Sequence, residues 1–142
     1  MLIKIKPRKR ARFHAIQALY QRELAGTDYL ELRVQFYEDN IERHPVDWDF
    51  FHDLINGVEK YQIELDNMIR PLVVREFESV KPVELAILRL GAYELNHRLE
   101  IPFQVIINEY VEHAKELGAT DGHRFVNGLL ERLSHQVRAE AS

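Results

Sequence analysis

The chain has 142 residues, of which 46% are hydrophobic and 30% are charged, a composition typical of soluble globular proteins. It contains no cysteine, which excludes disulfides, thiolate zinc sites and cysteine nucleophiles. No apolar run is long enough to cross a membrane, and the N-terminus lacks the apolar core of a signal peptide. We therefore expect one domain over residues 1–142, located in the cytoplasm, with no membrane partner.

Basic residues are concentrated at the N-terminus, although the formal net charge is -4. Residues 1–22 contain no acidic residue and seven basic ones: Lys4, Lys6, Arg8, Lys9, Arg10, Arg12 and Arg22. A basic segment on an acidic body indicates a localised anionic partner. The alternative is a terminus that only increases solubility.

The first two predicted helices lie in the N-terminal third. Residues 1–7 are expected to form a flexible basic arm, and a helix follows over 8–25 until Gly26 ends it. Thr27 or Asp28 can cap the second helix. Its inward stripe is predicted to be Leu30, Val34, Tyr37 and Ile41.

A long third helix is predicted over 48–70, with Asp47 as its N-cap. Gly57 would permit close contact with a neighbouring helix. The apolar positions alternate steps of three and four, as in a heptad repeat: Phe51, Leu54, Val58, Tyr61, Leu65, Met68 and Leu72. A helical bundle within one chain explains this pattern, and a coiled-coil homodimer is the alternative.

Three further helices complete the predicted fold. The fourth follows Pro82 and is apolar nearly all round, so we expect it at the centre. The fifth begins after Pro102 and ends at Gly118, which suits a left-handed C-terminal position. Thr120 or Asp121 can cap the sixth helix. Because no strand alternation is found, the sequence predicts an all-α fold, with two small bundles sharing a core.

The start of the sixth helix also has the residues of an anion site. His123, Arg124 and Asn127 surround a helix N-terminus, where free N–H groups and the helix dipole favour negative charge. An ordinary capped helix is the alternative interpretation. The motifs of the common enzyme classes are absent, so we expect no enzyme, no catalytic residue, no metal and no cofactor.

Acidic residues on the fourth and fifth helices form either a solvated face or a surface for a basic protein. These residues are Glu84, Glu94, Glu109, Glu112 and Glu116.

Seven short motifs, in order along the chain, resemble those of the NusB family of transcription antitermination factors. They are RKRAR (8–12), AIQALY (15–20), VELAILRLGAYEL (83–95), IP (101–102), INE (107–109), AKELG (114–118) and RFVNG (124–128). The resemblance implies two three-helix bundles. It also implies binding of boxA, a single-stranded RNA of ribosomal operon leaders, together with NusE, a small-subunit ribosomal protein, within an antitermination complex on RNA polymerase.

The resemblance also implies roles for individual residues. The candidates for RNA contact are Arg8, Lys9, Arg10, Arg12, Tyr20, Asp121, Arg124 and Phe125. The candidates for the NusE surface are Glu84, Phe103 and Glu109. The chain departs from the family at Tyr110 and His113, where alanine and leucine are usual. The competing hypothesis is a protein-interaction module or homodimer without an RNA role.

Overall fold

The computed structural model describes residues 5–118 and 121–139. Its elements over these ranges are α1 (Ile5–Ala25), α2 (Tyr29–Asn40), α3 (Trp48–Ile69), the short 3-10 helices η2 (Arg70–Leu72) and η3 (Phe77–Ser79), α4 (Pro82–His97), α5 (Phe103–Leu117) and α6 (Gly122–Val137). These ranges contain no strand, which confirms the all-α prediction. No helix within them is long and apolar enough to cross a membrane.

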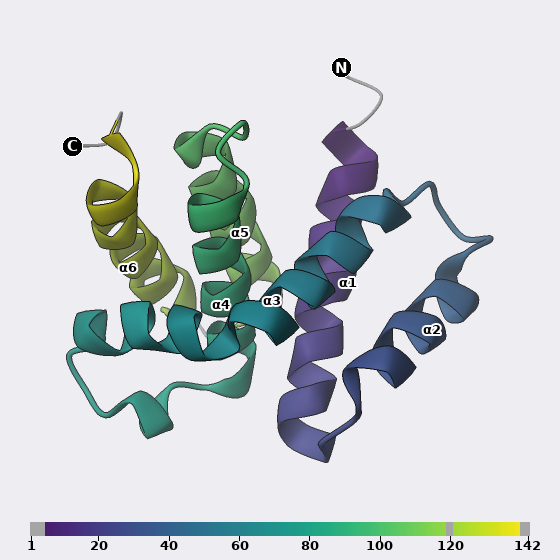
Figure 1. Ribbon diagram of the computed structural model, residues 1–142, viewed down its shortest axis with the longest axis horizontal. Helices are drawn as coiled ribbons and strands as arrows, with labels where there is room; N and C mark the ends of the chain where they lie inside the picture. Colours follow the sequence, from purple (N-terminus) through teal and green to yellow (C-terminus); the bar gives the residue numbers. More distant parts are fainter. Residues whose placement is uncertain (1–4, 119–120, 140–142) are drawn as a thin grey trace.

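The helices form two groups of three (Figure 1). Helices α1, α2 and α3 make one group, and α4, α5 and α6 make the other. Helix α3 crosses between the groups and packs on α4, which also contacts α1, α5 and α6. The predicted pair of small bundles sharing a core is therefore confirmed.

Helix α4 lies at the centre because apolar residues surround it on every side. Leu88, Leu90 and Leu95 have no exposed surface, and Pro82 starts the helix where its missing N–H costs no hydrogen bond. Gly57 of α3 faces Tyr93 so closely that a Cβ at this position would overlap the tyrosine ring. The close helix contact predicted at Gly57 is thus present between α3 and α4.

The apolar seam of α3 packs against other helices of the same chain. Phe51, Leu54, Val58 and Leu65 are fully buried, so packing inside the bundle accounts for the heptad-like spacing. The side chain of Asp47 accepts a hydrogen bond from the backbone N–H of Phe50 at 3.0 Å, which confirms the predicted N-cap.

Helix α1 begins at Ile5, so residues 5–7 are helical instead of part of a flexible arm. Pro7 fits in this first turn, because the N–H that proline lacks would have no partner within the helix. The rest of the predicted arm, residues 1–4, lies outside the described ranges.

The inward face predicted for α2 is wrong. The buried residues of α2 are Tyr29 and Leu32, and Phe36 packs against the core from a partly buried position. The hydroxyl of Tyr29 donates to Oε1 of Gln62 at 2.6 Å, and the guanidinium of Arg22 lies 3.9 Å from the Tyr29 ring centroid. These contacts set the rotation of α2. They leave the predicted stripe exposed: Leu30, Val34, Tyr37 and Ile41.

Two helix ends also differ from expectation. Gly118 has an extended backbone (φ -94°, ψ 177°), and the one positive φ in the described ranges, 70°, belongs to Gly26. Asp121 precedes α6, but its side chain makes no capping hydrogen bond. The alternative cap, Thr120, lies outside the described residues.

Arg138 follows α6 and fixes the connection between α4 and α5. Its buried guanidinium donates to the carbonyl oxygens of Leu95 at 2.8 Å, Ile101 at 3.0 Å, Arg98 at 3.1 Å and Glu94 at 3.3 Å. These carbonyls belong to the end of α4 and the turn after it, and those of Glu94 and Arg98 also accept the backbone N–H groups of Arg98 and Ile101.

Candidate nucleic-acid interface

The basic residues at the start of α1 face different surroundings. Arg8 donates from Nε to Oδ2 of Asp47 at 3.4 Å, and Arg10 donates from Nη1 to the carbonyl oxygen of Pro45 at 3.0 Å. Lys9 pairs with two carboxylates of α5, those of Glu109 and Glu112. All three basic side chains are partly exposed, so each can still reach an anion at the surface.

Arg12 faces the interior, which contradicts its prediction as an RNA contact. The residue is 3% exposed. Its guanidinium donates to both carboxylate oxygens of Glu94, at 2.8 and 2.9 Å. Burial by itself would lower the pKa of Arg12, but the hydrogen bonds and the charge of Glu94 outweigh burial and raise this pKa above its usual value. The hydroxyl of Tyr110 also donates to Glu94, at 2.5 Å. Arg12 is therefore part of a buried ionic cluster.

The acidic residues of α4 are also buried, so they form neither a solvated face nor a partner surface. Glu94 has no exposed surface and Glu84 is 3% exposed. The Glu84 carboxylate lies against Gly122 at the N-terminus of α6: a Cβ added to Gly122 would be 2.6 Å from its Oε2 atom. At this position the helix dipole stabilises the negative charge. The prediction of Glu84 as a NusE contact is wrong for this reason.

The predicted partner residues of α5 are accessible in part. Phe103 is partly buried against the core. The Glu109 side chain is 18% exposed and accepts from Lys9 and Arg12. Beside them on α5, Val105 is an exposed apolar residue.

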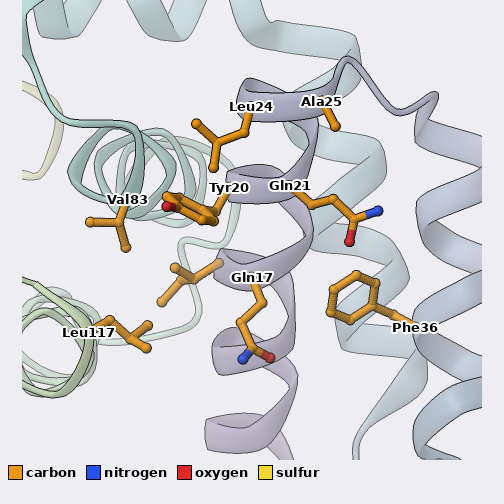
Figure 2. Close-up of a pocket in the computed structure, with 9 residues that line it drawn as sticks. Gln17, Tyr20, Gln21, Leu24, Ala25, Phe36, Val83 and Leu117 are labelled. Atoms are coloured by element: carbon orange, nitrogen blue, oxygen red, sulfur yellow. The ribbon is translucent and has the colours of Figure 1, made fainter.

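Two hollows lie along one face of α1, and together they are called the groove here. The first, of about 340 Å³, lies at the basic end between Arg10, Asn40 and His113. The second, of about 740 Å³, lies around Tyr20 between Phe36 and Leu117. Figure 2 shows α1 with Phe36 on one side and Leu117 and Val83 on the other. The floor residues of α1 recur at helical spacing: Arg10, Phe13, His14, Gln17, Tyr20, Gln21 and Leu24.

A third hollow, of about 500 Å³, lies at the start of α6. Asp121 and Phe125 line it together with Arg75 and Lys81. The guanidinium of Arg75 lies 4.8 Å from the centroid of the Phe125 ring, a distance at which a cation and an aromatic face attract each other. Arg124, in the first turn of α6, is exposed.

The first turn of α4 connects the last two hollows. Val83 lines the hollow around Tyr20, and its neighbour Glu84 lines the hollow around Phe125. The first turn of α4 therefore lies between the hollow around Tyr20 and the hollow around Phe125. The basic end of α1 lies further away, because ten helical residues from Arg10 to Tyr20 span about 15 Å.

Sequence reasoning missed several basic and imidazole side chains that line these hollows. Arg43 and His44 follow α2, and Arg75 and Lys81 lie in the segment between α3 and α4. Their common signal is a positive or titratable side chain in a connecting segment, which sequence alone does not place. The described residues contain no group of three or more side chains suited to hold a metal ion.

Comparison with known proteins shows similarity to the NusB family model and to proteins named NusB. Residues 9–135 match the model of the NusB family. The chain is 47% identical to the transcription antitermination protein NusB of Marinobacter nauticus over 92% of this chain and 82% of that protein. It is 44% identical to the protein of the same name from Hahella chejuensis, over 94% of this chain and 89% of that protein.

Solved structures resemble the fold. The structure of T. maritima NusB has a TM-score of 0.81 at 29% identity and covers 95% of this chain and 96% of that one. A complex of the antitermination factors NusB and NusE with double-stranded RNA contains a chain with a TM-score of 0.83 at 24% identity, covering 93% and 98%. At that identity the second likeness concerns the fold alone.

Proposed function

Because the chain belongs to the NusB family, as its motifs predicted, we propose that it is a transcription antitermination factor that binds boxA RNA together with NusE. In this role it is an adaptor without catalytic activity. It joins an RNA element of ribosomal operon leaders to the antitermination complex on RNA polymerase, in the cytoplasm.

The groove along α1 is the observation that carries this proposal. Single-stranded RNA is recognised by positive charge along its backbone and by aromatic rings on which its bases stack. The groove offers basic side chains at one end and Tyr20 further along, and the Phe125 hollow follows beyond the first turn of α4. We assign RNA contact to Arg8, Lys9, Arg10, Tyr20, Asp121, Arg124 and Phe125.

We propose that NusE binds on α5, at Phe103 and Glu109. Lys9 links the two surfaces, because it pairs with Glu109 and Glu112 of α5. Burial lowers the pKa of Lys9, but the hydrogen bonds and charges of these two carboxylates outweigh it and raise the pKa overall. Lys9 therefore stays charged at neutral pH and can contact a phosphate near the partner surface.

The second candidate function is a homodimer or protein-interaction module. The exposed apolar stripe of α2, defined above, is the observation that favours it, because a row of apolar side chains at the surface is typical of an interface. Mass measurement in solution, alone and with NusE, separates the two functions. A stable homodimer that binds neither boxA RNA nor NusE would support the second.

Replacing Arg10 with alanine is expected to reduce the salt dependence of RNA binding. Each lost phosphate contact lowers the slope of log affinity against log salt by about 0.7 for a single strand. Binding to all RNA sequences should weaken by a similar factor. The measurement is titration of a boxA RNA, with NusE present, at several salt concentrations.

The matched control is Arg132→Ala, because Arg132 is an exposed arginine of α6 that lines none of the three hollows. An equal change of slope in both variants would contradict a localised phosphate contact at Arg10. Absence of RNA binding by the parent protein, even with NusE, would reject the function itself.

Replacing Phe125 with alanine is expected to weaken RNA binding by about 1–3 kcal/mol, with little change in salt slope, because a stacked base is lost but no phosphate contact. Phe125 is half-buried and its ring also packs on the core. Equilibrium unfolding of the same variant must therefore be measured.

The two roles of Phe125 give different results. A purely structural phenylalanine should cost about 3–5 kcal/mol of stability when cut to alanine, while the folded fraction binds normally. In that case Asp121 and Arg124 would carry this side of the interface.

A further inference from the structure

The hollow at the basic end of the groove contains a buried histidine with free hydrogen-bonding capacity. His113 of α5 is 2% exposed, and it lines this hollow of about 340 Å³. Neither of its ring nitrogens makes a hydrogen bond of normal geometry among the described residues, although the backbone of Lys9 and the carboxylate of Glu116 lie nearby. Buried polar groups are almost always paired in proteins, so a buried imidazole at the edge of a hollow indicates a ligand that supplies the partner.

The surroundings of His113 favour its neutral imidazole. Burial lowers its pKa, and the positive charge of Lys9 lowers it further, against the opposite effect of Glu116, Glu109 and the backbone of Lys9. A neutral imidazole has one N–H donor and one nitrogen acceptor. The ligand should therefore present both a donor and an acceptor, as the edges of the nucleobases do.

Aromatic rings continue the hollow beside His113. The centroid of the Phe13 ring lies 5.5 Å from that of His113. His14, on the same wall of α1, stacks on Trp48 with ring centroids 5.9 Å apart and planes within 10°. Flat rings of this kind are platforms for a planar heterocycle.

Basic side chains line the opening, although Lys9 is paired with Glu109 and Glu112 of α5. Lys9, Arg10 and Arg43 line the hollow, and Glu116 is the one carboxylate among its lining residues. The Oε2 atom of Glu116 is 3.8 Å from Nδ1 of His113. A ligand with a planar polar ring and flanking negative charge matches this lining, and the volume lies within the range of ligand pockets, which starts at about 300 Å³.

We propose that this hollow, named here the His113 pocket, receives one unstacked base of the bound single-stranded RNA, while Arg10 and Arg43 contact the adjoining phosphates. This inference rests on the proposed function and adds a base-reading position at the basic end of the groove. Contacts between basic side chains and phosphates carry no sequence information. Such contacts alone would not need a buried hydrogen-bond donor and acceptor in the pocket.

The experiment is an abasic scan of a boxA RNA. One base at a time is removed while the phosphate chain is kept, and affinity is measured with NusE present for the parent, His113→Leu and His97→Leu proteins. In the parent, removal of one particular base is expected to weaken binding roughly tenfold, within the range for a lost stacked base. In His113→Leu, binding of intact RNA should weaken by a similar factor, and removal of that base should have no further effect.

His97→Leu is the matched control, because His97 is a partly buried histidine of α4 stacked on Tyr61 and lines none of the three hollows. It should retain the parent's sensitivity at every position of the scan. Two results would show that the pocket does not read a base. In one, His113→Leu still loses affinity on removal of every base to which the parent responds. In the other, His113→Leu and His97→Leu lose their response to the same base equally. Failure of the parent to bind any boxA RNA would instead reject the proposed function.

A second measurement needs no variant. The chain has a single tryptophan, Trp48, which is stacked on His14 at the pocket. Intact RNA is expected to change the fluorescence of Trp48, and RNA lacking the critical base should change it much less. An equal change with both RNAs would show that only the phosphates bind there, and would overturn the proposal.

Discussion

Arg12→Ala is expected to lower the free energy of unfolding by about 3–5 kcal/mol, because the change leaves Glu94 as a buried charge without its cationic partner. The remaining partner in that cluster would be the hydroxyl of Tyr110. Urea denaturation followed by circular dichroism measures the effect. Arg10→Ala is the control, since Arg10 lies two residues away and makes one exposed hydrogen bond; its cost should stay below about 1 kcal/mol.

A double variant tests the physical reason for the loss. Replacing Arg12 with methionine and Glu94 with leucine removes both charges and keeps apolar volume, so it should destabilise the protein less than Arg12→Ala alone. If Arg12→Ala cost no more than Arg10→Ala, Arg12 would be a surface residue and would return to the list of RNA contacts.

Leu88→Ala is expected to cost about 2–5 kcal/mol, because Leu88 has no exposed surface at the centre of α4 and its removal leaves a cavity between packed helices. Leu99→Ala provides the control: Leu99 is 64% exposed in the turn after α4, and its change should be within about 0.5 kcal/mol. A loss below about 1 kcal/mol for Leu88→Ala in equilibrium unfolding would mean that the centre of the core lies elsewhere.

The helices and their order could be predicted because each carries strong local signals. Gly26 and Pro82 mark helix ends, Asp47 caps α3, and α4 is apolar on most of its surface. The rotation of α2 could not be predicted, because α2 has two apolar rows. One contains Leu30 and Val34, and the other contains Tyr29 and Leu32. Only contacts with α1 and α3 decide which row is buried, and these contacts are not local in sequence.

The candidate interface was predictable only in part, again because some of its contacts are not local in sequence. Charge density shows that the start of α1 is basic, but not which basic side chain turns inward. Glu94 held the missing signal, since a carboxylate in a helix that is mostly apolar requires a buried cationic partner. Arg43 and His113 line one hollow and Arg75 lines another, and each comes from a different segment of the chain, so only the fold reveals these linings.

The position of Arg138 in the chain has a consequence for folding during synthesis. The carbonyls that it satisfies belong to residues 94–101, which leave the ribosome well before Arg138 does. Until then the carbonyls of Leu95 and Ile101 lack their hydrogen bonds to Arg138, so the connection between α4 and α5 is not yet fixed. Helices α1 to α3 emerge first, as N-terminal segments do, and they too lack their central neighbour α4. The connection between α4 and α5 therefore gains its last hydrogen bonds only after α6 has been made, and truncation just before Arg138 should destabilise this connection.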